Sequence, residues 1–207
     1  LYYTHGGSPG RFGGIRRIRP DGTDDQAVVS GGFGDFAVTP DGTGLIYAKG
    51  GVHDKFYFQR DLYHYDLATG AETQLTDGER PFQLAITPDG NSVIYARYNL
   101  GESTPSIRRV NIETGEITTL KDFTPDYAVE GMSLSPDGST VALSIYRRGG
   151  YSDIYTMPTS GGDLTPVTQD RGTDTGPRFS PDGQYLFFSS DRTGVYNLYA
   201  YNLGSNA

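Results

Sequence analysis

The chain has 207 residues, no cysteine and a formal net charge of −8. The negative charge argues against sustained nucleic-acid binding through phosphate contacts, and the lack of cysteine excludes disulfides and thiolate metal sites. No apolar run approaches the roughly 18 residues of a membrane-spanning helix, so we expect no membrane span. The 29 glycines and 12 prolines are frequent enough to interrupt any long helix, and they favour an all-β fold rich in turns.

One four-residue phrase recurs along the chain at a nearly constant spacing. A hydroxyl residue, Pro, Asp and Gly stand in this order at residues 39–42, 87–90, 135–138 and 180–183. Self-similarity at a period of about 20–50 residues is typical of repeat architectures. Pro, Asp and Gly also suit successive positions of a tight turn. We therefore predict a repeated unit with this turn between its first two strands.

The unit at residues 82–120 shows the predicted order of strands, which we label a to d. Residues 82–87 form the apolar strand a, residues 92–97 form strand b, and residues 107–112 form strand c after a long polar loop. A hairpin at residues 113–116, with Gly at the left-handed position, leads into strand d. Four antiparallel strands per unit, repeated in series, are typical of the blades of a β-propeller.

These repeats resemble a known family. The Pro-Asp-Gly turns, the b strand ending at residues 187–192 and the c strand at residues 197–201 are similar to the blades of TolB-like β-propellers. The resemblance covers essentially the whole chain. In that family, propellers occur as periplasmic interaction modules, as gating domains of prolyl-oligopeptidase-like and tricorn-type peptidases, and inside larger secreted or envelope proteins. The resemblance therefore implies a periplasmic or extracellular location in the bacterial cell envelope.

Both ends of the chain fall inside a unit. Residues 1–7 align with strand b at residues 45–51, and residues 199–205 form a strand c with no strand d after it. We expect one propeller domain over residues 1–207, with three complete blades between two partial ones. The expected blade units lie at about residues 1–30, 33–76, 82–120, 129–168 and 175–207.

Partial blades would leave unpaired strand edges. We therefore expect a segment of a longer polypeptide that forms a ring of about six to eight blades. The alternatives are a five-bladed ring with two incomplete blades and edge pairing between copies of the chain.

The two faces of such a propeller differ in this sequence. The a–b turns and c–d hairpins share one face and are uniform, whereas the b–c loops on the other face vary in length. These loops concentrate aromatic and arginine side chains, the types enriched at binding hot spots. We expect a protein or peptide partner to bind there, with the anchors Phe56, Arg60, Arg147, Arg148 and Tyr151. The alternative is that exposed loops vary freely and tyrosine is simply abundant.

Strand a of each unit is expected to line a central channel. Arg178 stands where other units have alanine or serine, and Asp35, Glu130 and Asp174 are expected toward the channel mouth. An arginine near carboxylates can hold an anionic group or a peptide terminus. The interpretation we favour is an internal pair between Arg178 and a carboxylate that fills the channel.

We expect no catalytic residue, metal site or cofactor. Residues 6–10 match G-x-S-x-G, but a β-strand follows them, whereas a nucleophile elbow leads into a helix. His5, His53 and His64 lack the spacing of metal ligands.

Three functions remain open. The leading interpretation is a non-catalytic recognition or scaffold module that binds a protein or peptide on its b–c loop face. The second is the substrate-gating propeller of a larger peptidase whose catalysis lies outside these residues. The third is carbohydrate binding, because exposed aromatic rings and carboxylates suit sugars.

Overall fold

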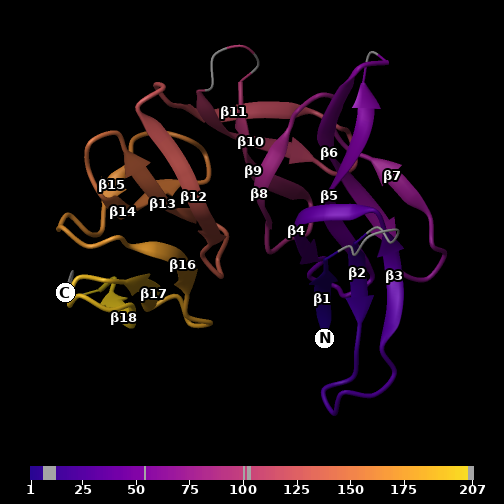
Figure 1. Cartoon of the computed structure of the whole chain (residues 1–207), viewed down its shortest axis with the longest axis horizontal. Helices are drawn as coiled ribbons and strands as arrows, with labels where there is room; N and C mark the ends of the chain where they lie inside the picture. The colour runs from indigo at the N-terminus through magenta and orange to yellow at the C-terminus, as the bar shows by residue number, and fades with distance from the viewer. Residues whose placement is uncertain (7–12, 54, 100, 102–103, 205–207) are drawn as a thin grey trace.

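The computed structural model describes residues 1–6, 13–53, 55–99, 101 and 104–204. In these ranges every regular element is a β-strand, and the strands form five antiparallel sheets (Figure 1). The described part of the chain holds no helix with the length and apolarity that a membrane crossing requires.

The strands are as follows. The first sheet contains β1 (Tyr2–His5), β2 (Gly14–Arg17) and β3 (Gln26–Ser30). The second contains β4 (Gly32–Val38), β5 (Gly44–His53), β6 (Tyr57–Asp66) and β7 (Glu72–Gln74). The third contains β8 (Pro81–Ile86), β9 (Ser92–Tyr98), β10 (Pro105–Asn111) and β11 (Ile117–Asp122). The fourth contains β12 (Tyr127–Leu134), β13 (Thr140–Arg147), β14 (Ser152–Pro158) and β15 (Thr165–Pro166). The fifth contains β16 (Thr175–Phe179), β17 (Tyr185–Ser190) and β18 (Asn197–Asn202).

The five sheets follow one another along an arc in the order of the chain (Figure 1). Strands β4, β8, β12 and β16 lie on the inner side of the arc, and each contacts the next. Within each sheet, a strand pairs only with its neighbours in sequence. Three four-stranded sheets between two three-stranded ones confirm the prediction of a β-propeller built from four-stranded antiparallel blades.

The repeated turn has the same hydrogen bonds in all four copies. In the first, the Gly42 amide donates to the Thr39 carbonyl at 2.8 Å, and Asp41 accepts from the Thr39 hydroxyl at 2.6 Å and from the Thr43 amide at 3.0 Å. These donors, the Thr39 hydroxyl first, lower the pKa of Asp41 to about 2. Each copy therefore closes its a–b hairpin with local bonds alone, which explains why the sequence predicted it.

Two of the turn glycines allow the cost of a left-handed backbone to be separated from the cost of a steric clash when alanine replaces glycine. Gly42 and Gly138 have φ of 72° and 73°, a region that costs a side chain about 1–2 kcal/mol. A Cβ at Gly42 would meet nothing within 4 Å, whereas one at Gly138 would lie 2.9 Å from Pro88 Cδ. We expect Gly42→Ala to lower the free energy of unfolding by about 1 kcal/mol and Gly138→Ala by about 2–3 kcal/mol in urea titrations. Equal losses would show that the contact with Pro88 contributes nothing.

Alternating residues of each second strand pack against the two neighbouring sheets. In β5, Leu45 and Tyr47 pack toward the first sheet, and Ile46 and Ala48 pack toward the third. All four are fully or almost fully buried. Full burial of a large apolar side chain contributes about 1.5–3 kcal/mol, so the sheets are held together by the apolar layers between them.

No sheet in the described part of the chain packs on the outer face of the fifth sheet. Leu198 on β18 is 73% exposed, while its counterparts Leu62, Ile107 and Ile154 are fully buried. This exposed apolar face is consistent with the expected larger ring, in which a further blade would cover it.

Candidate functional site

The β5–β6 hairpin carries the most exposed aromatic side chains of the described b–c loops. Both strands have ten residues, and their tip projects beyond the neighbouring strands at the upper right of Figure 1. We call Val52, Phe56, Tyr57 and Phe58 the hairpin patch; Phe56 is 87% exposed and Phe58 is 71% exposed. Apolar side chains this exposed and this close in sequence indicate a surface available to a partner.

A pocket of about 420 Å³ lies beside the outer half of this hairpin, and we call it the hairpin pocket. Its walls come from the second and third sheets: Phe58, Gln59, Arg60, Arg80, Pro81, Phe82 and Tyr98. The rings of Phe82 and Tyr98 stack with centroids 4.7 Å apart. The pocket therefore combines an aromatic wall with two guanidinium groups.

The position of Phe58 depends on the absence of a side chain at Gly50. Gly50 pairs with Arg60 across the β5–β6 ladder. A Cβ at Gly50 would lie 2.2 Å from Cζ of Phe58, so the ring rests directly on the Gly50 backbone. Glycine at this point of the strand lets an aromatic ring approach the sheet closely.

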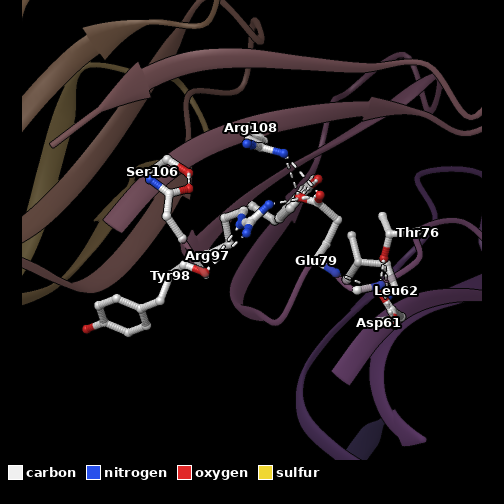
Figure 2. Close-up of polar contacts among 11 residues, drawn as sticks. Asp61, Leu62, Thr76, Glu79, Arg97, Tyr98, Ser106 and Arg108 are labelled. Carbon is white, nitrogen blue, oxygen red and sulfur yellow. Dashed lines mark hydrogen bonds and ion pairs between the residues drawn. The ribbon is translucent and has the colours of Figure 1, made fainter. Parts of the chain in front are cut away.

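A buried charged network lies next to the pocket residue Tyr98 (Figure 2). The Glu79 carboxylate accepts hydrogen bonds from Arg97 Nη1 at 2.9 Å, Arg108 Nη1 at 3.0 Å and the Tyr95 hydroxyl at 2.9 Å. Glu79 and Arg97 are both buried. Burial and the negative charge of Glu79 raise the pKa of Tyr95. Since Arg80 follows Glu79 and Tyr98 follows Arg97, the network fixes both walls of the pocket.

Asp61 orders the segment that leads to Glu79. Its carboxylate accepts from the Thr76 hydroxyl at 2.8 Å and from the amides of Gly78 and Glu79, both at 3.0 Å. The Thr76 hydroxyl in turn accepts from the Leu62 amide (Figure 2). These bonds tie the link between the second and third sheets to the start of strand c.

Arg80 has a strained backbone. Its φ of 52° lies in the left-handed region, which costs a residue other than glycine about 1 kcal/mol. Its amide donates to the Arg60 carbonyl at 3.0 Å, which holds the two arginines side by side along the backbone. Neither the Arg60 nor the Arg80 side chain forms a hydrogen bond or ion pair with a described residue. Both guanidinium groups can therefore form direct hydrogen bonds with a ligand, although Asp35 lies within electrostatic range of Arg60.

Arg147, Arg148 and Tyr151 form a separate exposed group on the fourth sheet. Arg147 and Arg148 line a shallow depression with Tyr127, and the Arg148 amide donates to the Asp126 carbonyl at 2.7 Å. Tyr151 is 47% exposed. The third sheet separates this group from Phe56 and Arg60, so the five expected anchors form two surfaces.

On the inner side of the arc, Asp35 lies within electrostatic range of Arg178 and Arg60. Burial raises the pKa of Asp35, and the two arginines oppose that shift. Arg178 Nη1 donates to the carbonyls of Met132 at 3.1 Å and Pro177 at 2.8 Å. Arg178 thus forms no direct ion pair with a described carboxylate, and Asp35 interacts with it only at longer range.

Asp174 and Glu130 do not join Arg178 at the channel mouth. Asp174 is fully buried and accepts from Arg192 Nη2 at 2.9 Å. The exposed Glu130 accepts from the Ser152 hydroxyl. A β-bulge interrupts β16 between Thr175 and Arg178, and another interrupts β12 beside Glu130.

Arg80, Phe82 and Glu79 did not emerge from the sequence as site residues. They lie in or next to the link between strands d and a, which is short and resembles an ordinary connection. One signal was present: Arg97 stands at a strand position occupied by Ile145 in the fourth sheet, and a charge there requires a buried partner.

The structure describes no catalytic or metal centre in the residues that it covers. Ser8 of the G-x-S-x-G match and the side chain of His53 lie outside the described part. In that part, no group of three or more His, Asp or Glu side chains is placed to hold a metal ion.

Two relatives match short stretches of the chain. It is 32% identical over 104 residues to the Tol-Pal system protein TolB of Helicobacter pylori, which is 50% of this chain and 24% of that protein. It is 47% identical over 47 residues to dipeptidyl-peptidase 5 of Porphyromonas endodontalis, which is 21% of this chain and 7% of that enzyme. The chain therefore matches less than a quarter of the length of either relative.

Solved structures share the fold over almost the whole chain. TolB from Acinetobacter baumannii superposes with a TM-score of 0.73 at 20% identity, over 99% of this chain and 50% of that one. A prolyl endopeptidase superposes with a TM-score of 0.71 at 16% identity, over 95% of this chain and 32% of that one. At these identities the similarity shows the fold alone.

A family model assigns the chain more directly. The model described as TolB beta propeller domain matches residues 85–207, which is more than half of the chain. The matched part includes three of the four Pro-Asp-Gly turns, all of the fourth and fifth sheets, and the third sheet apart from most of β8. Together with the antiparallel blades along the arc, this match shows that the chain belongs to the TolB beta propeller domain family.

Proposed function

We propose that this propeller is a non-catalytic recognition module that binds a protein or peptide on its b–c loop face. The observation that carries the proposal is the hairpin patch, in which Phe56, Tyr57 and Phe58 are exposed close in sequence to the exposed Arg60. Aromatic and arginine side chains contribute most to binding at protein interfaces. The opposite face, with its short uniform turns, offers no comparable group among the described residues.

The same proposal places residues 1–207 in one propeller domain in the bacterial cell envelope. The similarity to a Tol-Pal system protein TolB supports this location. The net charge of −8 favours a protein or peptide over a nucleic acid as partner.

A set of charge and aromatic variants tests the loop face. Binders would be selected from a displayed library of envelope-protein fragments, and their affinities measured by calorimetry. We expect Phe56→Ser with Tyr57→Ser, or Arg147→Glu with Arg148→Glu, to weaken binding at least tenfold. Neither pair of substitutions should lower the free energy of unfolding by more than about 1 kcal/mol, because all four side chains are exposed.

The matched control is on the opposite face. Glu113→Lys with Glu116→Lys alters two exposed charges of a c–d hairpin, and we expect affinities within twofold of the unmodified chain. Binders that tolerate both loop-face pairs equally well would refute the placement of the site.

A second candidate is the substrate-gating propeller of a larger peptidase. It is favoured by the similarity to a prolyl endopeptidase structure and to dipeptidyl-peptidase 5. In that case Arg178 and Asp35, on the inner side of the arc, would filter substrates. Intact-mass analysis of the natural polypeptide, with sequencing of both ends, distinguishes the two, because a gating propeller requires an attached hydrolase domain.

A further inference from the structure

The tip of the β5–β6 hairpin is a two-stranded ribbon with free outer edges. β4 pairs with β5 only as far as Lys49, and β7 pairs with β6 only at residues 63–65. Residues 50–53 and 57–59 thus pair with each other and with no third strand in the described part of the chain. Such an edge can accept another strand through main-chain hydrogen bonds.

The free edge of β6 leads directly into the hairpin pocket. Phe58 belongs to both, and the stacked rings of Phe82 and Tyr98 form the facing wall. Side chains alternate along a strand, so an added strand beside residues 57–59 would direct every second side chain toward this wall. A volume of about 420 Å³ accommodates one large aliphatic or aromatic side chain with part of its backbone.

The positive charges at the pocket indicate that its ligand is negatively charged. Arg60 and Arg80 form no direct ion pair with a described residue, although Asp35 lies within electrostatic range of Arg60 and the chain as a whole carries a net charge of −8. Guanidinium groups bind carboxylates through paired hydrogen bonds. The left-handed backbone of Arg80 raises the local conformational energy, so the surrounding structure must hold this arginine in place.

On the basis of the proposed recognition function, we infer that the hairpin tip binds an extended acidic peptide by strand addition. A large apolar side chain of the peptide occupies the hairpin pocket against Phe82 and Tyr98, and a neighbouring carboxylate pairs with Arg60 and Arg80. A peptide fits better than a sugar because the free strand edge serves only a ligand with a polypeptide backbone.

The first test is direct binding of a defined probe. The probe is a fluorescein-labelled ten-residue peptide that alternates phenylalanine and glutamate, and its control carries glutamine in place of glutamate. By fluorescence anisotropy we expect the acidic peptide to bind at least tenfold tighter, with an affinity that falls as salt is added. Arg60→Glu combined with Arg80→Glu should abolish this preference, whereas the matched charge reversal of the exposed Arg17 and Arg19, Arg17→Glu with Arg19→Glu, should leave the affinity within twofold.

Two further measurements separate binding from folding. Arg80→Gly removes a guanidinium and relieves the left-handed backbone, so the thermal unfolding midpoint should stay the same or rise while affinity falls at least fivefold. Hydrogen exchange should slow at the amides of Phe58 and Arg60, which point away from β5, when the peptide is present, as strand pairing requires.

Three results would overturn the inference: no binding of the acidic peptide, binding that is indifferent to Arg60 and Arg80, or binding without amide protection. Tighter binding of an acidic oligosaccharide than of the peptide would also overturn it, in favour of a carbohydrate ligand. None of these results would refute the broader recognition function, which fails only if library-selected binders ignore both loop-face pairs of substitutions.

Discussion

Glu79→Ala is expected to lower the free energy of unfolding by about 3–5 kcal/mol, the largest effect of any single substitution considered for this chain. The carboxylate accepts from Arg97, Arg108 and Tyr95 between the second and third sheets. Its removal leaves Arg97, which is 6% exposed, as a buried charge without a counter-ion. Chemical denaturation monitored by tyrosine fluorescence and circular dichroism would measure the loss.

The control is the removal of an acid from an exposed pair. Asp163 contacts Lys121 at 3.4 Å and is fully exposed, so Asp163→Ala should change the free energy of unfolding by less than about 0.5 kcal/mol. A loss at Glu79 no larger than that at Asp163 would mean that water reaches the network and screens it.

The second prediction concerns two aspartates at equivalent positions, just before Leu62 and Ile154. Asp61 accepts hydrogen bonds from Thr76, Gly78 and Glu79, so Asp61→Asn places an amide against donors and should cost about 2–3 kcal/mol. Asp153 is also buried, but its Oδ1 has no hydrogen-bond partner. Asp153→Asn should therefore raise the free energy of unfolding at pH 7 by about 1 kcal/mol.

The pH dependence gives this pair a second signature. Burial, reinforced by the charge of Asp174, raises the pKa of Asp153 above its ordinary value. The folded state therefore binds the proton of Asp153 more tightly than the unfolded state does, and wild-type stability falls as the pH rises between the ordinary and the raised pKa. The advantage of Asp153→Asn should be complete above the raised pKa and shrink as the pH falls toward the ordinary one. Denaturation of both proteins across this range measures the difference, and a constant difference would contradict the assignment.

The fold was predictable because its signals are local. Each Pro-Asp-Gly turn closes through bonds within six residues, as the Thr39 hydroxyl shows by binding Asp41 and Gly44. Apolar alternation in the strands then specified which side chains face the neighbouring sheets, as with Leu45 and Ile46. Neither feature depends on contacts distant in sequence.

The site was predictable only in part, for a physical reason. Phe56 and Arg60 were indicated because an unusually long loop with aromatic and arginine residues is visible in the sequence. Glu79 and Arg80 were not indicated, because their roles arise from contacts with Arg97 and Arg60, which are brought together by packing of two sheets. Asp174 was expected toward the channel mouth with Arg178, but its carboxylate instead accepts a hydrogen bond from Arg192, a residue 18 positions away in sequence.

Each strand pairs only with its neighbours in sequence, and this affects how the chain folds. Hydrogen bonds between paired strands join residues that are close in sequence, so the contact order is low for an all-β protein and each blade can form early and locally.

The same pattern affects how the chain can evolve. Duplication or loss of one whole blade leaves the strand pairing of the other blades intact, much as in solenoid repeats whose stability is a sum of nearest-neighbour terms. Ring size can therefore change by gene duplication without redesign of the existing blades, while a single long hairpin such as β5–β6 acquires a binding role of its own.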